Sequence, residues 1–540
     1  MASAAQPRAR FSPPDAPSRE PQWTAARHAV RTLWLIFSAE LIVFALIRLP
    51  LVLSFDSYAF ADRGMFPTVC YLVTHGRRPA IDFGYPYGLL PILMTQGVFH
   101  LFRWAPISHE CAMGICAIVA AWGMARFARA MRLPPVGVIF LVVAFPFAIV
   151  PSYPSFVHAM EAAVLCNALA EQAAGHRSAA LALATVACLI KPAMGYVYGF
   201  VLVMLILFNM WRNAAMTPRI AWRLLLRTLA PAALIGASLI ALLAICYGPL
   251  PVVRTLFPAT GTVEYYHMGL GSIFRGGRNL WYQPKQFPAF YLFTVAGFWT
   301  AATMWLVIAG LWAAPRLALA FWRKTKPAAG EEMVLTCAIL HVAFITSFFG
   351  SPVSWEYYSY ILVMGVAAAC LNSSTASNIL AGLTLLALSG QSSHLAMAAK
   401  AWKTTSRSPE AAGLWAPAEE QKAWQQVLGA IGSQRAVALI STGEVSVLFA
   451  QFQPPFGAYL APGVTLKPEL EHAMRVVADA PMVFAVTSGP LGYALDFFPR
   501  LRQGLQRRPA LLNIPRGENG TFTVYGPGET GRPTAPTRAP

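Results

Sequence analysis

The chain has 540 residues, of which 56% are hydrophobic and only 12% are charged, and its formal net charge is +18. Because a soluble domain usually has about 25% charged residues, this composition excludes an ordinary soluble protein. The basic charge could suggest a nucleic-acid partner, but the Lys and Arg residues gather in short clusters between apolar runs, as cytoplasmic loops of membrane proteins do. These clusters are Arg126, Arg129 and Arg132; Arg212, Arg219, Arg223 and Arg227; and Arg316, Arg323, Lys324 and Lys326.

Residues 1–30 are rich in Pro, Ala and Arg. This segment is too long and too often interrupted by proline for a signal peptide, and the apolar run after it lacks a small-residue cleavage site. The sequence therefore predicts a disordered cytoplasmic head over 1–30, followed by an uncleaved membrane span.

Apolar runs near the length needed to cross a bilayer, about 20 residues, recur over residues 31–400. Because a segment in lipid must satisfy its own backbone, these runs predict helices. The runs lie at 33–53, 88–102, 111–125, 136–150, 156–170, 179–190, 193–210, 225–246, 290–314, 333–349, 358–371 and 380–399. The predicted fold is an all-α polytopic membrane bundle of about 11–13 transmembrane helices, with outer loops at 54–88 and 249–288.

The basic clusters also orient the bundle. If 211–227 and 315–330 are cytoplasmic, the loop 249–288 lies outside and the C-terminal part of the chain ends outside. A cytoplasmic N-terminus then requires an odd number of spans, whereas the apolar runs number twelve. We expect one of the short runs within 136–210 not to cross. A simple count from the N-terminus also places the arginines of 126–134 outside, in conflict with the charge rule.

The segment after the first run carries unusual chemistry for a membrane chain. It reads "LSFDSYAFADRGMFPTVCYLVTHGRRPAIDFGYPYG" over 53–88. Asp56 follows the run by three residues and so lies at the membrane–water interface. That depth suits a general base between a lipid-anchored and a water-side substrate. The alternative is an aspartate that caps or solvates a helix end.

The motif "FDSYAF…HGRRPAIDFGYPYGLLP" resembles the first outer loop of the C-type (GT-C) membrane glycosyltransferases. In many of these an Asp follows the first span, and a pattern close to G-x-P-Y-x-D-F-x-Y-x-P-L leads into the second. Here Ala80 replaces the tyrosine of that pattern, and Gly-Leu-Leu-Pro replaces Gly-Pro-Leu. A Lys-Pro within the bundle, "LIKPAMGYVYGF" at 189–200, adds to the resemblance.

The resemblance implies transfer of a sugar from a polyprenyl phosphate, with Asp56 as catalytic base or acceptor-orienting carboxylate. Asp62 is a candidate second carboxylate for a metal or for acceptor hydroxyls, and the alternative is a solvated loop acid. Cations near the leaving phosphate would stabilise its developing charge. The candidate cations are Arg77, Arg78, Lys191, Arg275 and Arg278. Lys191 alternatively snorkels to the interface.

Further candidate binding residues lie elsewhere in polar positions. Asp82 begins a turn, and turn capping is the alternative to a role at the site. His158 and Glu161 share a helix face, where they bind sugar hydroxyls or satisfy each other. The outer loop near 257–288 contributes Glu264, His267, Arg275 and Arg278, and its alternative role is an interfacial aromatic belt.

Residues 401–527 are more polar and predict a small extracytoplasmic α/β domain, followed by a disordered tail at 528–540. "PAEEQKAWQQVLGAIG" and "PELEHAMRVVADA" have helical periodicity, whereas "AVALIS", "PMVFAVTS" and "TFTVYGP" predict strands. This domain contains no nucleotide-binding glycine motif. We expect it to bind the acceptor or to cover the site.

The leading hypothesis is a multi-pass glycosyltransferase of a bacterial inner (plasma) membrane, with the bacterial origin inferred from the Ala- and Arg-rich composition. Its partners would be a polyprenyl-phosphate sugar, a glycan, lipid or protein acceptor, and the lipid bilayer, with no nucleic acid. No cofactor is required by the sequence, no zinc-ligand spacing occurs among its cysteines, and a divalent metal is left open. The alternatives are a lipid-linked glycan ligase or polymerase, and a transporter or flippase of envelope precursors.

Overall fold

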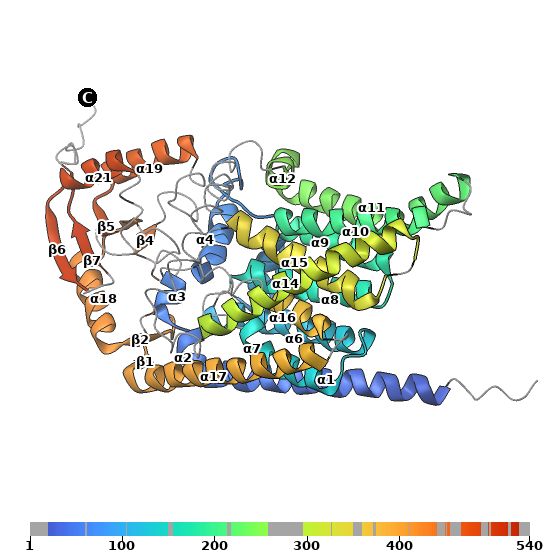
Figure 1. Ribbon diagram of the computed structural model, residues 1–540. Coiled ribbons are helices and arrows are strands. Elements are labelled where there is room, and N and C mark those ends of the chain that lie inside the picture. Colours follow the sequence, from blue (N-terminus) through green and yellow to red (C-terminus); the bar gives the residue numbers. More distant parts are fainter. Residues whose placement is uncertain are drawn as a thin grey trace, which may run out of the picture.

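The structure is a computed structural model of the chain. It describes residues 20–528 apart from 60–61, 104, 150–154, 213–217, 258–294, 326, 349–358, 371–373, 410, 440–448, 450, 454–465, 488–494, 496–497 and 517–519. A helical bundle occupies one side of the molecule and a small sheet domain the other (Figure 1).

Each of the twelve predicted apolar runs falls on a helix. The helices are α1 (Glu20–Ile47), α5 (Leu90–Phe102), α6 (Pro106–Ala130), α7 (Pro135–Ile149), α8 (Phe156–Ala173), α9 (Arg177–Ile190), α10 (Pro192–Arg212), α11 (Pro218–Tyr247), α14 (Val295–Trp322), α15 (Ala329–Phe348), α16 (Ser359–Ala369) and α17 (Ser374–Thr404). Short helices α2 (Leu49–Val52), α3 (Phe55–Ala59), α4 (Asp62–Thr74) and α12 (Pro249–Leu256) lie between them. The fold class predicted for the bundle is therefore confirmed.

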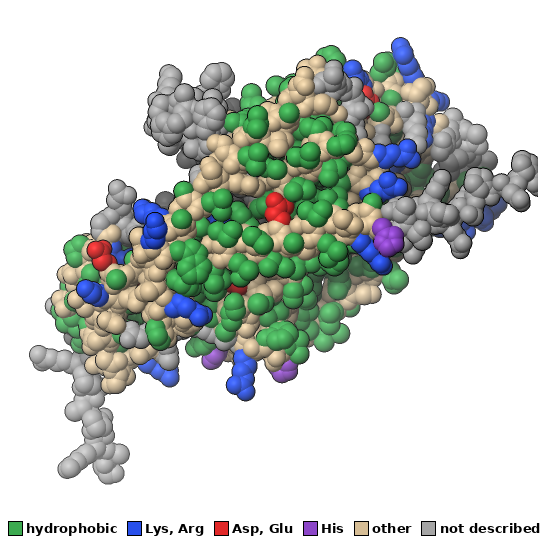
Figure 2. Space-filling view, turned by 90° about the horizontal axis from the view of Figure 1, so that it is seen from below, with side chains coloured by type: hydrophobic (Ala, Val, Ile, Leu, Met, Phe, Trp, Pro, Cys, Tyr) green, Lys and Arg blue, Asp and Glu red, His purple; other side chains and the backbone are tan. Residues whose placement is uncertain are grey.

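Helix α1 begins at Glu20, inside the segment for which the sequence predicts a disordered head. Pro21 lies in the first turn, where a missing N–H does no harm. No proline follows within α1, so the helix continues unbroken into the apolar run. Along the face formed by the outer sides of α1 and α17, hydrophobic side chains predominate, and Lys and Arg gather toward its ends (Figure 2). A bilayer would contact such a band.

Among the residues that the structure describes, six helices are long and apolar enough to cross a membrane by length and composition. They lie within α1, α6, α10, α11, α14 and α17. Shorter apolar helices include α5, α7, α9 and α16. The 13 residues of α5 rise only about 20 Å, against about 30 Å of hydrocarbon.

Ion pairs join several helix ends at one end of the bundle, here called the basic end. Arg126 in α6 pairs with Glu171 in α8 at 2.5 Å. Arg177 at the start of α9 pairs with Glu332 in α15 at 2.8 Å. Arg316 in α14 pairs with Glu331 at 3.2 Å. The cluster at 126–132 therefore lies at the same end as the cluster that begins at Arg316, and the conflict raised by counting from the N-terminus is removed.

The opposite end of the bundle carries the C-terminal domain and is here called the domain end. There the Trp402 indole donates to the Ile47 carbonyl at 2.8 Å, which brings the last turns of α17 and α1 together. The Tyr58 hydroxyl oxygen lies 3.1 Å from the Pro106 carbonyl oxygen, at the start of α6. The Gly88 N–H donates to the Ile190 carbonyl at 3.0 Å, at the end of α9.

These contacts correct the prediction of which run fails to cross. Helix α5 starts two residues after Gly88 and is followed, four residues after its end, by Pro106, so both of its ends lie at the domain end. The run at 88–102, and not one within 136–210, is the one that does not pass between the two ends. In the described part of the chain, the helices that pass between the two ends are α1, α6–α11 and α14–α17. Their number is odd, as the predicted orientation requires.

The C-terminal domain is an α/β domain, as predicted. Its five-stranded sheet has the order β4-β3-β5-β7-β6. The strands are β3 (Ala436–Leu439), β4 (Phe452–Gln453), β5 (Met482–Val486), β6 (Ala510–Pro515) and β7 (Thr521–Tyr525), with helices α18 (Ala418–Ile431), α19 (Lys467–Asp479) and α21 (Pro499–Gln506). Strand β3 is parallel to β4 and β5, whereas β7 is antiparallel to β5 and β6. A two-stranded ribbon, β1 (Thr405–Arg407) with β2 (Trp415–Pro417), connects α17 to this sheet.

Both faces of the sheet are covered, so successive residues of its central strands enter different cores. Val437 and Leu439 pack with α19 and α21 on one face. Ala436 and Ala438 pack with Trp424 of α18 on the other. That second core also contains Phe55, from α3 near the start of the chain. The predicted boundary at residue 400 falls in the last turn of α17, and the first outer loop is built into the domain.

Candidate functional site

Asp56 lies on α3 between the bundle and the C-terminal domain. The residues before it are held by the C-terminal domain, since the Trp415 backbone N–H donates to the Leu53 carbonyl at 2.8 Å. Phe55 is 1% exposed and packs against Trp424, with 5.1 Å between the ring centroids. Asp56 is thus the polar residue next to an anchored aromatic one, and its side chain is 52% exposed.

One cation of the C-terminal domain faces Asp56. The Arg516 guanidinium, from the end of β6, lies with Nη2 3.8 Å from Asp56 Oδ1. Desolvation by the surrounding protein raises the pKa of Asp56, and the charge of Arg516 opposes that rise. Asp56 is therefore a somewhat more basic carboxylate than one in water, which suits a proton acceptor.

Arg516 also contacts a second carboxylate, Glu420 of α18, and its guanidinium carbon lies 4.3 Å from the centre of the Phe522 ring. Glu420 is 4% exposed and accepts a hydrogen bond from the Trp424 indole at 2.9 Å. The Arg516 side chain is only 8% exposed. Arg516 and Glu420 are not among the residues that the sequence predicts, because nothing in sequence spacing connects them with residue 56.

Behind α3, a polar network ties it to the bundle. The Tyr58 hydroxyl donates to Glu110 Oε1 at 2.8 Å, and Arg63 pairs with the same oxygen at 3.0 Å. Arg63 also donates to the Val52 carbonyl. Burial and the Glu110 charge raise the pKa of Tyr58, so its phenol stays protonated and acts as a donor. The backbone that carries Asp56 is thereby held from both sides.

The charged pair of the turn at 78–82 is explained by local structure. The Asp82 carboxylate accepts the Arg78 backbone N–H at 2.7 Å and the Arg78 side chain at 3.2 Å. Partial burial opposes ionisation, but these hydrogen bonds lower the pKa of Asp82. Arg77 donates to the Asp82 carbonyl at 3.1 Å and approaches His472 of α19 at 3.5 Å. The turn-capping alternative therefore fits Asp82, with Arg78 as its partner.

Glu469 of α19 fastens the C-terminal domain to the same loop. Its Oε2 atom accepts the Gly84 N–H at 2.8 Å and the N–H of Leu466 at 3.0 Å. The side chain is only 2% exposed. An acid at the start of a helix reads from sequence as an ordinary cap, so its partner in the outer loop was not predicted.

Lys191 is 2% exposed at the junction of α9 and α10. Its Nζ lies 5.7 Å from the centre of the Tyr87 ring. The Tyr87 ring in turn meets the His158 ring edge-on, with 6.4 Å between the ring centroids. His158 Nδ1 lies 3.8 Å from Oε2 of Glu161, also on α8. The structure therefore brings together three sequence candidates, namely Lys191, His158 and Glu161.

Gly88 explains how the loop motif reaches Lys191. A Cβ atom at this position would lie 2.0 Å from the Leu189 carbonyl oxygen. Only glycine allows the backbone to approach α9 so closely and to form the hydrogen bond to Ile190. The Tyr85 hydroxyl also donates to the Gly88 carbonyl at 3.1 Å. The motif "YPYG" thus packs the loop against the residue before Lys191.

Aromatic contacts connect α3 with this cluster. Tyr58 meets His109 at 6.0 Å between ring centroids, and His109 meets Phe156 at 5.6 Å. The contacts continue through Phe66 to Tyr87. The Asp56 helix and Lys191 therefore belong to one packed layer at the domain end of the bundle.

Several candidates lie outside what the structure describes. Glu264, His267, Arg275 and Arg278 fall within 258–294, and the side chain of Asp62 is likewise not described. Among the described residues, no group of three or more His, Cys, Asp and Glu side chains could hold a metal ion.

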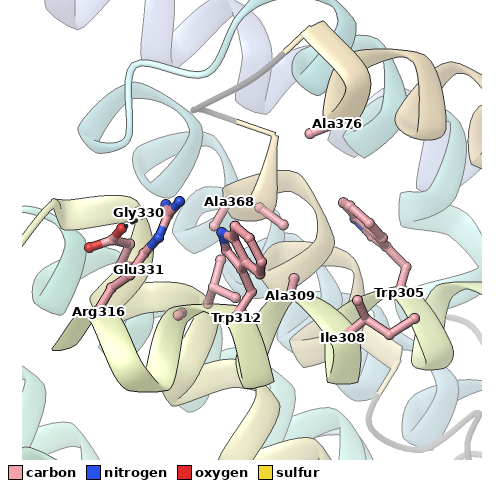
Figure 3. A pocket seen from close by; sticks show the side chains of 12 residues that line it. Trp305, Ile308, Ala309, Trp312, Arg316, Gly330, Glu331, Ala368 and Ala376 are labelled. Carbon is pink, nitrogen blue, oxygen red and sulfur yellow. Dashed lines mark hydrogen bonds and ion pairs between the residues drawn. The ribbon is translucent and has the colours of Figure 1, made fainter. Parts of the chain in front are cut away.

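A hollow of about 360 Å³ lies at the basic end, lined by Trp305, Trp312 and the Arg316–Glu331 pair among α14–α17 (Figure 3). Helix α16 and the start of α17 form its other side. It lies at the opposite end of the bundle from Asp56, so it is no part of the candidate site.

The fold is thus a multi-pass helical membrane bundle with a small α/β domain docked on one end. No family model matches the chain, and no curated protein does. Two similar solved structures are of ArnT from Cupriavidus metallidurans. One, bound to undecaprenyl phosphate, has 13% identity, a TM-score of 0.45, and covers 90% of this chain and 97% of its own. The apo form has 13% identity, a TM-score of 0.46, and covers 94% and 98%.

A third similar structure is the arabinofuranosyltransferase AftD from Mycobacteria, with 13% identity and a TM-score of 0.44. The match covers 90% of this chain and 40% of AftD. At these identities and TM-scores, the activity of this chain has to follow from its own residues.

Proposed function

We propose that the protein is a membrane glycosyltransferase of the C-type (GT-C) kind, which moves a sugar from a polyprenyl-phosphate donor to an extracytoplasmic acceptor with inversion. Asp56 is the general base. The chain lies in a bacterial inner membrane, with its N-terminus in the cytoplasm and its C-terminal domain outside.

One observation carries this proposal: an ionisable, half-exposed carboxylate stands directly beyond the first long apolar helix, on backbone fixed by both the bundle and the C-terminal domain. A carboxylate that merely solvates a helix end needs no such support. A base must be held within hydrogen-bond reach of the proton that it accepts, so rigid support is what catalysis requires.

The reaction is a single displacement. An acceptor hydroxyl gives its proton to the Asp56 carboxylate while its oxygen bonds to the anomeric carbon. The bond between that carbon and the phosphate oxygen breaks, and its electron pair stays on the polyprenyl phosphate. The acceptor attacks from the face opposite the leaving group, so the configuration of the anomeric carbon inverts.

Lys191 is the described cation best suited to the leaving phosphate. It is buried at the domain end, beside the aromatic residues of the "YPYG" turn, where a positive charge acts strongly because little water screens it. His158 and Glu161, next to it, would bind hydroxyls of the transferred sugar. Arg77 is a weaker candidate, since its guanidinium already contacts Asp82 and His472. Arg275 and Arg278 keep this role on sequence grounds.

The test is transfer by the purified full chain. Radiolabelled polyprenyl-phosphate sugars are supplied with membrane extract, as the acceptor source, from cells that lack this chain. We expect label in a glycan, lipid or protein fraction, with one free polyprenyl phosphate released for each sugar transferred. If the label instead crosses the membrane of a proteoliposome still attached to its lipid, the protein is a flippase and the proposal fails.

A lipid-linked glycan ligase or polymerase uses the same chemistry on a larger donor. The same assay separates it from the proposed enzyme, because a ligase transfers only preassembled oligosaccharides from their lipid carrier. A comparison of lipid-linked sugars in cells with and without the chain then shows which donor accumulates.

A further inference from the structure

We propose that Arg516 is a positioning residue, through which the C-terminal domain keeps the base Asp56 ionised. This inference rests on the proposed function, since it concerns the base assigned there. It gives the domain a part in the chemical step, beyond binding the acceptor or covering the site.

The geometry separates the two partners of Arg516. Glu420 makes close contact with the guanidinium, whereas Asp56 Oδ1 stands 3.8 Å from Nη2. That second distance is too long for a hydrogen bond but short enough for strong Coulombic attraction. Arg516 therefore stabilises the negative charge of Asp56 without occupying the lone pairs that must accept the proton.

Glu420 explains why Arg516 stays where it is. The Glu420 carboxylate is itself oriented by the Trp424 indole at 2.9 Å, and the guanidinium lies over the Phe522 ring. Trp424 and Phe522 belong to the core that also holds Phe55. Asp56 and Arg516 are therefore both held by residues of the same core, so the fold fixes the distance between them.

Other charged groups near α3 have different partners. On α4, Arg63 pairs with Glu110 of α6 and donates to the Val52 carbonyl, on the side where Tyr58 meets the bundle. Strand β2, which also packs on α3, contributes no charged residue. Among the described residues, Arg516 is therefore the charge that opposes the effect of desolvation on Asp56, and Glu420 acts through its contact with Arg516.

The two residues should act on Asp56 with opposite sign. Arg516 favours the carboxylate, so its loss should make Asp56 harder to ionise. Glu420 neutralises part of the Arg516 charge, so its loss should make Asp56 easier to ionise. Damage to the fold would not produce opposite shifts, and this difference makes the inference testable.

The experiment measures protonation of Asp56 without any sugar substrate. The full chain in detergent is treated with a hydrophobic carbodiimide, which reacts with protonated carboxyls, and labelling of the Asp56 peptide is followed by mass spectrometry against pH. We expect the midpoint to rise by about one pH unit in Arg516→Gln, as a unit charge near 4 Å at a partly exposed site implies. It should fall in Glu420→Gln, which keeps an oxygen for the Trp424 indole.

Arg507→Gln is the matched control, because Arg507 is exposed in the same domain and its loss changes the net charge equally. The labelling midpoint of Arg507→Gln should equal that of the wild type. The midpoint of Arg516→Lys should lie close to the wild-type value, because the positive charge is kept. An unchanged midpoint in Arg516→Gln, or shifts of the same sign in Arg516→Gln and Glu420→Gln, would overturn the inference. In the transfer assay, the acid limb of kcat/KM should move with the labelling midpoint in each variant.

Failure of the proposed function has a different signature. If Asp56→Asn still transfers sugar while Arg516→Gln shifts the labelling midpoint, Asp56 is not the base although Arg516 controls its ionisation. If Asp56→Asn is inactive and Arg516→Gln shifts neither the labelling midpoint nor the acid limb, the base assignment stands and the role of Arg516 falls.

Discussion

The two ends of the helical bundle use charged residues differently. At the basic end, arginines pair with glutamates of neighbouring helices, as in Arg126–Glu171 and Arg177–Glu332. At the domain end, Asp56 is half exposed and faces a cation that the C-terminal domain supplies. Lys191, also at the domain end, is almost fully buried beside an aromatic ring.

This difference separates charged residues that stabilise the structure from charged residues that take part in the reaction. Pairs between adjacent helix ends neutralise each other and fix helix positions, which is a structural use. A carboxylate left open to solvent but held by rigid neighbours keeps its capacity to take a proton. Substitution of Asp56 or Lys191 should therefore affect activity, whereas substitution of the paired charges at the basic end should affect stability alone.

The largest effect is expected for Asp56→Asn. Loss of the general base should lower kcat by about 10²–10⁴-fold, measured as sugar transferred per mole of chain. Asp479→Asn is the control, because Asp479 is an exposed acid on α19 of the C-terminal domain. Transfer at the wild-type rate by Asp56→Asn would remove the distinction drawn between the two ends.

Lys191→Met should produce the next largest effect. Removing a charge-assisted contact to the donor phosphate should lower kcat/KM for the polyprenyl-phosphate donor about 10–100-fold. Lys324 offers a matched control, since its Nζ lies 5.1 Å from the centre of the Trp211 ring, near the basic end. Equal losses in Lys191→Met and Lys324→Met would mean that both lysines serve only packing.

Glu469→Ala should loosen the contact between the C-terminal domain and the first outer loop. It removes two hydrogen bonds to backbone N–H groups, each with a charged acceptor, which contribute roughly 1.5–3 kcal/mol each. Faster hydrogen exchange over residues 78–88 is the expected result. The exposed neighbour Glu471→Ala should leave that exchange rate unchanged, and protection equal to wild type in both variants would contradict the proposed anchor.

Asp56→Asn should also raise the melting temperature slightly at neutral pH. Because the pKa of Asp56 is raised in the folded state, folding favours its protonated form. The favourable contribution is present below the unfolded-state pKa and is lost as pH rises through the folded-state pKa. Thermal scans should show Asp56→Asn above the wild type at pH 7–8, with the difference disappearing toward pH 3. A lower melting temperature at pH 7–8 would contradict this sign.

The smallest effect is expected for Arg316→Gln at the basic end. Arg316 is about half exposed, so its pair with Glu331 should contribute only about 0–1 kcal/mol to stability. Sugar transfer should be unaffected. A clear loss of transfer in Arg316→Gln would mean that the basic end also takes part in the activity.

Much of the fold followed from the sequence because its signals are local. Lipid forces the apolar runs to satisfy their own backbone, and the described part of each of the twelve runs is largely helical. Short apolar runs between turn residues predict strands β3 and β5, and alternation of residue type predicts β7. Strand β6 was missed, because "ALLNIP" lies at the edge of the sheet, with exposed and half-buried residues in turn.

The sequence misplaced the run that does not cross. The run at 88–102 is apolar along most of its length, so hydropathy cannot distinguish it from a span. What decides its path is where its ends are held, at Gly88 against Ile190 and at Pro106 against Tyr58. Such contacts join distant parts of the chain, and a local pattern carries no trace of them.

The candidate site likewise contains some residues that the sequence indicates and others that only tertiary contacts show. Asp56, Lys191, His158 and Glu161 attract attention as polar residues next to apolar runs. Arg516, Glu420 and Glu469 look like ordinary surface residues of an α/β domain, and only the docked domain shows which of them face the outer loop. Their contribution depends on tertiary contact, which has no sequence period.

The place of Phe55 in the core beside Trp424 has a consequence for biosynthesis. A ribosome inserts the first hairpin of this protein long before it translates residues 418–525, so Phe55 waits in contact with water or a chaperone until the last strands emerge. A chain released before these strands are made would leave the Phe55 ring without its partners in that core. The surroundings of Asp56 are therefore complete only when the whole polypeptide has been made.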